Sequence, residues 1–66
     1  MRYYSTQRPV APGTYPRPAG NRTTMIKNFD GRIFCPEINR QAWGFIEYEK
    51  PLDERAAADY ELTAWR

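Results

Sequence analysis

The apolar and polar positions along the chain predict several strands followed by one short helix. Residues 2–6 place two tyrosines beside a threonine, a composition that favours an extended strand. Residues 42–49 give the strongest strand pattern, with large apolar side chains on both faces. Such a strand is expected to be central in its sheet or to have one face covered by another segment.

A hairpin is predicted from Asp30-Gly31, which lies between two apolar runs within residues 23–35. Asp-Gly is typical of a type I′ turn, because both central residues of that turn require positive φ. We therefore expect a two-residue β-hairpin in which Ile26 faces Cys35.

Three other places are expected to shape the backbone. Residues 36–41 favour a turn with Asn39 at its tip. Pro12-Gly13 suits the centre of a type II turn, with positive φ at the glycine. Gly44 lies between two rings and is expected to mark a bulge or a close approach of another backbone.

The only predicted helix covers residues 52–63. Asp53 is a suitable N-cap residue. Leu52, Ala56 and Tyr60 recur at helical spacing and form one apolar stripe. A helix of this length is marginal alone, so we expect it to dock on the sheet.

Residues 7–22 are expected to be irregular, because four prolines in this segment prevent both a helix and a central strand. Such a long irregular segment is either a wrapping arm or a functional loop. We expect one of its apolar residues to pack on the sheet face of Trp43 and Phe45. The candidates are Val10, Pro12 and Tyr15.

Together these elements predict an α+β fold. It consists of a small antiparallel sheet of three or four strands, one C-terminal helix and a Pro-rich N-terminal arm. The 66 residues are 41% hydrophobic and 15% aromatic, so a single small domain over residues 1–66 must fill its core with a few large rings.

The chain shows no sign of membrane insertion or export. It has no apolar run of the roughly 18 residues that a membrane span needs. Its N-terminus lacks the apolar stretch of a signal peptide. One cysteine cannot form an intramolecular disulfide. These features favour a cytoplasmic protein.

Charge is distributed unevenly along the sequence. Residues 1–29 carry five bases and no acid, whereas residues 30–66 carry five bases and all eight acids. Two interpretations remain open. The basic arm lies on its own acidic body, or it binds an anionic partner such as nucleic acid.

The residue types argue against catalysis. The chain has no histidine to act as a general base near neutral pH. Cys35 lies in a predicted strand, where apolar burial makes a thiol unreactive. Glu47 and Glu49 could bind a metal or take part in acid–base chemistry, although such pairs are more often solvated beside basic neighbours. We expect no enzymatic activity, no metal and no cofactor.

Partner binding suits the sequence better, because rigid rings and arginines provide apolar contact and charge-assisted hydrogen bonds. These residue types gather in the arm and in the strongest strand. The candidate binding residues are Arg2, Tyr3, Tyr4, Arg8, Trp43 and Tyr48.

Several stretches carry a resemblance to known proteins. They are residues 2–9, 12–14, 28–29, 42–52 and 60–62, of which Trp-Gly-Phe-Ile-Glu-Tyr at 43–48 is the most specific. In these stretches the chain resembles small proteins of Firmicutes. Those proteins are similar to small domains inside large polyvalent proteins of conjugative elements and phages. The resemblance implies a bacterial cytoplasmic accessory protein and no reaction, since the group offers no catalytic motif.

Three functions are therefore considered. The first is a non-catalytic binding module that acts through a protein partner in a mobile-element or defence context. The second is a nucleic-acid-binding protein that uses the basic, Tyr-rich N-terminal half. The third is an enzyme or metal protein that uses Glu47 and Glu49. The sequence specifies neither the partner nor the oligomeric state.

Overall fold

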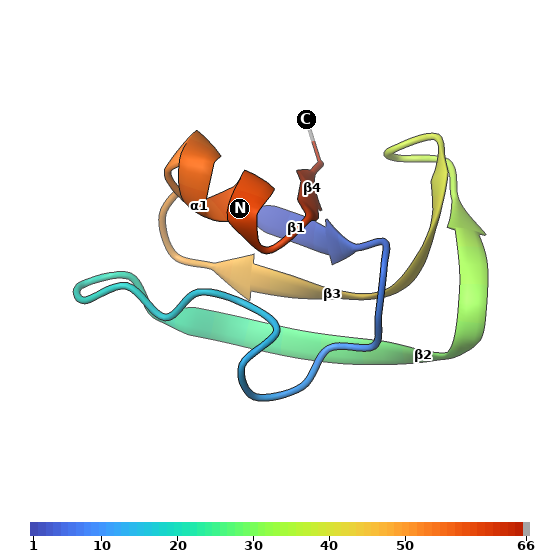
Figure 1. Ribbon diagram of the computed structural model, residues 1–66, viewed down its shortest axis with the longest axis horizontal. Helices are drawn as coiled ribbons and strands as arrows, with labels where there is room; N and C mark the ends of the chain where they lie inside the picture. Colours follow the sequence, from blue (N-terminus) through green and yellow to red (C-terminus); the bar gives the residue numbers. More distant parts are fainter. Residues whose placement is uncertain (66) are drawn as a thin grey trace.

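A computed structural model describes residues 1–65, which form a four-stranded sheet and one short helix (Figure 1). The elements are β1 (Arg2–Ser5), β2 (Thr23–Cys35), β3 (Arg40–Tyr48), α1 (Glu54–Asp59) and β4 (Leu62–Ala64). This arrangement confirms the predicted α+β class.

The strand order in the sheet is β2-β3-β1-β4, and every neighbouring pair is antiparallel. β1 is therefore an inner strand, although it comes first in the chain. It pairs with β3 through Tyr3↔Ile46 and with β4 through Tyr3↔Ala64. The two edges of the sheet are the long β2 and the short β4.

The predicted hairpin at Asp30-Gly31 is wrong. These residues lie inside the single strand β2, where the pairing with β3 shifts register between Asn28 and Ile33. Gly31 does adopt positive φ, at 88°. The Asp-Gly pair thus supplies an irregularity within one strand, and Ile26 pairs with Ile46 rather than with Cys35.

The chain reverses instead at residues 36–39, which connect β2 to β3. Asn39 has φ 56° and donates its N–H to the Pro36 carbonyl. The prediction of a turn with Asn39 at its tip is confirmed. Asparagine tolerates this left-handed conformation better than most residues.

The helix has the predicted N-cap, but it begins at Glu54 instead of residue 52 and ends early. The Asp53 side chain accepts a hydrogen bond from the N–H of Arg55, so the N-cap is confirmed. α1 ends at Asp59, and the prediction that it reaches residue 63 is wrong. Glu61 adopts φ 56°, which breaks the helical path and starts β4 at Leu62. Leu62 is buried, but it belongs to the strand β4 instead of to the helix.

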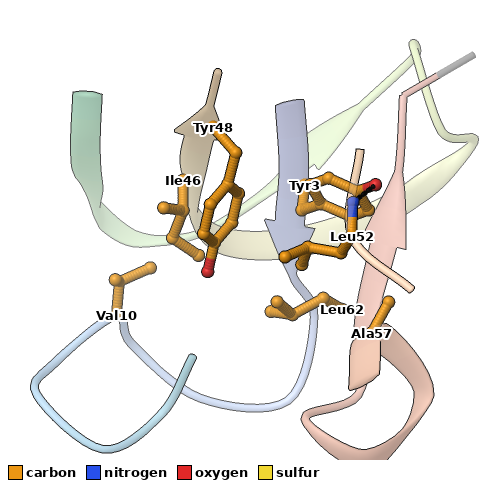
Figure 2. Packing of buried hydrophobic residues seen from close by; sticks show 7 residues of the cluster. All are labelled: Tyr3, Val10, Ile46, Tyr48, Leu52, Ala57 and Leu62. Atoms are coloured by element: carbon orange, nitrogen blue, oxygen red, sulfur yellow. Dashed lines mark hydrogen bonds between the residues drawn. The ribbon is translucent and has the colours of Figure 1, made fainter. Parts of the chain in front are cut away.

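Residues 7–22 contain neither helix nor strand, and part of this arm enters the core. Val10 packs with Ile46 and Tyr48 on the sheet face that also receives Leu52, Ala57 and Leu62 (Figure 2). The expectation that the arm covers the face of Trp43 and Phe45 is wrong. The arm and α1 share the opposite face, where apolar residues from both halves of the chain complete a single cluster.

Two asparagines fix the arm to the sheet. Asn28 accepts a hydrogen bond from the N–H of Val10 (2.7 Å) and donates one to its carbonyl (2.9 Å). Asn21 makes the same pair of bonds with Lys50, at 2.9 and 3.0 Å. Each amide side chain thereby satisfies both backbone groups of one residue outside the regular ladder.

A turn in the arm and a close contact in the sheet follow the sequence prediction. Thr14 donates its N–H to the Ala11 carbonyl across Pro12-Gly13, and Gly13 has φ 90°. Gly44 lies so near the Lys27 carbonyl oxygen that a Cβ at this position would collide with it. The predicted close backbone approach at Gly44 is confirmed.

Candidate partner-binding surface

Arg2 is engaged within its own sheet. Its guanidinium forms an ion pair with Glu47 (2.5 Å) and lies 4.0 Å from the centre of the Phe45 ring and 5.1 Å from that of Trp65. The Tyr4 hydroxyl and Glu47 raise the pKa of Arg2. This side chain is fixed by a carboxylate and two rings, so its charge is compensated inside the molecule.

Tyr4 extends this network. It is buried, and its hydroxyl donates a hydrogen bond to Glu37 at 2.5 Å. Burial, followed by the bond to Glu37, raises the pKa of Tyr4, and the same bond lowers the pKa of Glu37. Two carboxylates, an arginine and a tyrosine are thus linked across this face. The lowered pKa moves Glu37 further from the range in which a carboxyl could donate a proton at neutral pH.

Arg8 has a similar internal partner. It forms an ion pair with Glu61 at 2.5 Å, and about half of each side chain is exposed. Together with the Arg2–Glu47 pair, this contact supports the interpretation that the basic arm lies on its own acidic body. The prediction that Arg2 and Arg8 bind a partner stays a prediction, and binding through either residue would have to displace a carboxylate.

Three of the four candidate rings belong to the core. Tyr3 and Tyr48 pack edge to face with their centres 5.8 Å apart, and both hydroxyls are hydrogen-bonded. The Tyr3 hydroxyl accepts from the N–H of Leu52 (2.7 Å), and the Tyr48 hydroxyl donates to the Pro16 carbonyl (2.6 Å). Tyr4 is likewise buried, whereas Trp43 is half-buried. The tyrosines face inward because a domain this small has few other large side chains to bury.

Four of the six exposed large apolar side chains of the described chain lie instead on β2, where the sequence analysis placed no binding residue; the other two are Met1 and Trp65. The four residues on β2 are Met25, Ile26, Ile33 and Phe34, and each is between 43% and 55% exposed. The signal that could have identified them is that residues 23–35 are apolar on both faces. The incorrect hairpin hid this signal, because it paired Ile26 with Cys35 within residues 23–35 instead of leaving a single strand at the edge of the sheet.

Uncompensated bases accompany this strand. Arg17 and Arg22 line a hollow of about 260 Å³ beside Thr23, the first residue of β2. Lys27 and Arg32 are exposed along β2 itself. Among the ion pairs of residues 1–65, none involves these four side chains. Four bases without an ion pair therefore lie on or beside β2, where Asp30 is the one acidic residue of the strand.

Of the remaining chemical candidates, Glu47 is bound and Cys35 is enclosed, whereas Glu49 is exposed. The Glu47 carboxylate is bound by Arg2, while Glu49 lies just outside β3 and is exposed. Cys35 is buried, and burial, followed by the charge of Glu37, raises the pKa of its thiol. Within residues 1–65, no group of three or more His, Cys, Asp or Glu side chains could hold a metal ion.

Two general properties of the surface complete the description. An apolar hollow of about 410 Å³ lies beside α1, between the linker before the helix and the strands β1 and β4. No helix in the described part of the chain is long and apolar enough to cross a membrane.

Comparison with known proteins gives one match. A family model described as "Defence against restriction A C-terminal" matches residues 1–66 and so covers the whole chain. No curated protein and no solved structure matches this chain. The match fits the expected small domain of larger phage and mobile-element proteins.

Proposed function

We propose that this chain, which belongs to the Defence against restriction A C-terminal family, is a non-catalytic accessory domain that acts through a protein partner. In this proposal it helps a mobile element to withstand restriction in the cytoplasm of a bacterial host. The observation that carries the proposal is the family match over residues 1–66.

A protein partner is favoured by the exposed apolar side chains of β2. Four large apolar residues project from one edge strand of a domain whose other large rings are mostly buried. Apolar side chains gathered on one exposed element are typical of protein interaction sites. Nucleic-acid backbones offer mainly phosphates, which make no use of methionine and isoleucine side chains.

A non-catalytic role is favoured by the protonation behaviour of the ionisable groups. A general acid at neutral pH needs a raised carboxyl pKa, but the Tyr4 hydroxyl lowers that of Glu37. A nucleophilic thiol needs a lowered pKa, but burial raises that of Cys35.

The proposal is tested by challenging a restricting host. Unmodified DNA of the element is introduced into restricting and non-restricting strains. Each strain carries the gene either with the segment that encodes this chain or with that segment deleted. We expect deletion to reduce establishment of the element in the restricting strain alone. Equal establishment with and without the chain in the restricting strain would contradict the proposal.

Nucleic-acid binding is the alternative, and the basic hollow of Arg17 and Arg22 favours it. In that case the affinity for a labelled oligonucleotide would fall steeply with salt, because phosphate contacts release counterions. Replacing both arginines by alanine would reduce the salt dependence. Affinity that does not change between low and physiological salt would exclude this alternative.

A further inference from the structure

The β2 edge has the properties of a strand-docking site. β2 forms one edge of the sheet, so every second residue directs its backbone N–H and C=O away from β3. No backbone hydrogen bond joins residues 24–34 to the arm within the described chain. These outward groups are thus free to pair with another extended segment.

Pairing of β2 with β3 is regular over residues 25–28 and again over residues 33–35, of which 25–28 is the longer stretch. The register shifts on the N-terminal side, between Thr23 and Met25, and again after Asn28. At Asn28 the arm also approaches, through the hydrogen bonds to Val10. Bulges twist an edge and interrupt pairing. The site therefore accommodates a short strand and disfavours indefinite stacking of long ones.

The side chains of this stretch differ between the two faces. Met25 pairs with Glu47 and Lys27 pairs with Phe45, which places both on the same face of the sheet. Ile26 pairs with Ile46 and projects from the other face, where it is 45% exposed. A docked strand would meet a basic group on one side and an apolar group on the other.

The charges along the β2 edge indicate which kind of segment can dock there. Arg22, Lys27 and Arg32 lie at or beside this edge, where Asp30 is the one acid of β2. The other nearby acids are Glu47, which pairs with Met25 but is bound by Arg2, and Glu49, whose N–H bonds to the Arg22 carbonyl. Two copies of this chain paired edge to edge would bring like charges together, and lysine on an edge strand is a known device against such pairing. An acidic segment would be attracted by the same charges.

We propose that the protein partner docks an extended acidic segment, with alternating acidic and apolar residues, as a fifth strand against residues 25–28 of β2. Its acidic side chains lie on the Lys27 face and its apolar side chains on the Ile26 face. This inference rests on the proposed function, because it specifies how the partner of the accessory domain is held.

The first test uses a labelled ten-residue peptide of alternating glutamate and valine, with an alternating lysine and valine peptide as its counterpart. We expect the acidic peptide to bind and the basic one not to bind. Lys27→Glu should lower the affinity for the acidic peptide by about fivefold or more, because a cross-strand attraction becomes a repulsion. The matched charge reversal Lys50→Glu, on an exposed residue outside β2, should leave its affinity within about twofold.

Amide hydrogen exchange then locates the peptide. Strand addition should slow exchange of outward amides within residues 25–28 and leave those of α1 unchanged. Slower exchange around α1 alone would overturn the proposal. So would a β2-mediated dimer seen by sedimentation, or binding of a single-stranded oligonucleotide through Lys27 with no binding of the acidic peptide.

The restriction challenge separates this inference from the proposed function. We expect Lys27→Glu, but not Lys50→Glu, to reduce protection of the element. Full protection by Lys27→Glu, together with loss of protection on deleting the chain, would overturn the docking site and leave the proposed function standing. Full protection after deletion would overturn the proposed function itself.

Discussion

Tyr48 connects the arm to the core through its hydroxyl group. Its ring is buried against Tyr3, and its hydroxyl donates a hydrogen bond to the Pro16 carbonyl. Proline has no N–H, so a proline-rich segment can bind the sheet mainly through its carbonyl groups. A tyrosine that projects from a central strand is well suited to reach one.

Removing this hydroxyl should destabilise the fold. We expect Tyr48→Phe to lower the free energy of unfolding by about 1–3 kcal/mol, because the Pro16 carbonyl loses its partner in a buried place. Urea unfolding measures the change. Tyr60→Phe is the control, since Tyr60 is half-buried and its hydroxyl makes no hydrogen bond within residues 1–65. An equal loss in both variants would contradict this explanation.

Gly44 should tolerate no side chain. A Cβ here would collide with the Lys27 carbonyl and lie 3.0 Å from the Asn28 Cα, and both are backbone atoms that cannot rotate away. We expect Gly44→Ala to lower the free energy of unfolding by about 1–3 kcal/mol, which thermal unfolding would report. Gln41→Ala, at an exposed position of the same strand, should have little effect. Unchanged stability of Gly44→Ala would show that β2 can move away from β3.

At the scale of elements, sequence patterns located β1, β3 and the turn between β2 and β3, but they divided β2 into a hairpin and missed β4. β1, β3 and the Asp53 cap were predictable because their signals are local. The hairpin was wrong because Asp-Gly favours positive φ without specifying whether a turn or a bulge uses it. β4 was not predicted, since three residues carry no usable periodicity and its pairing with β1 is a tertiary contact.

The arm should loosen when its asparagine contact is removed. We expect Asn28→Ala to accelerate hydrogen exchange of the Val10 amide, because that N–H loses its acceptor. Exchange at Lys50 should not change, since Asn21 holds that residue. Asn21→Ala provides the reciprocal control. Acceleration of both amides in both variants would indicate that the arm is released as a whole.

At the scale of the whole molecule, charge is distributed unevenly over the fold. Asp53, Glu54, Asp59 and Glu61 lie in and around α1, while four bases without an ion pair lie at the end of the arm and on β2. The sequence showed this asymmetry only as a basic first half. It could not show that Arg2 and Arg8 are compensated or that three candidate tyrosines are buried, because both depend on strand order.

Stability should decline at alkaline pH. Burial raises the pKa of Tyr48, so the unfolded chain loses this proton at a lower pH than the folded chain. The resulting stabilisation is complete below about pH 10, the ordinary tyrosine value, and is lost as pH rises toward the folded pKa. Urea unfolding between pH 7 and 11.5 measures the decline. Tyr48→Phe should make the decline shallower without abolishing it, because burial also raises the pKa of Tyr4. An equally steep decline in that variant would assign the effect to other groups.

Because β1 lies between β3 and β4, the order of synthesis conflicts with the order of assembly. The first strand made must wait until residue 48 for one neighbour and until residue 64 for the other. At about 5–20 residues per second, the 16 residues between Tyr48 and Ala64 take about one to three seconds to synthesise. Until β4 pairs, β1 is an open edge of the sheet as well as β2, so this stage of assembly is the one most exposed to wrong pairing.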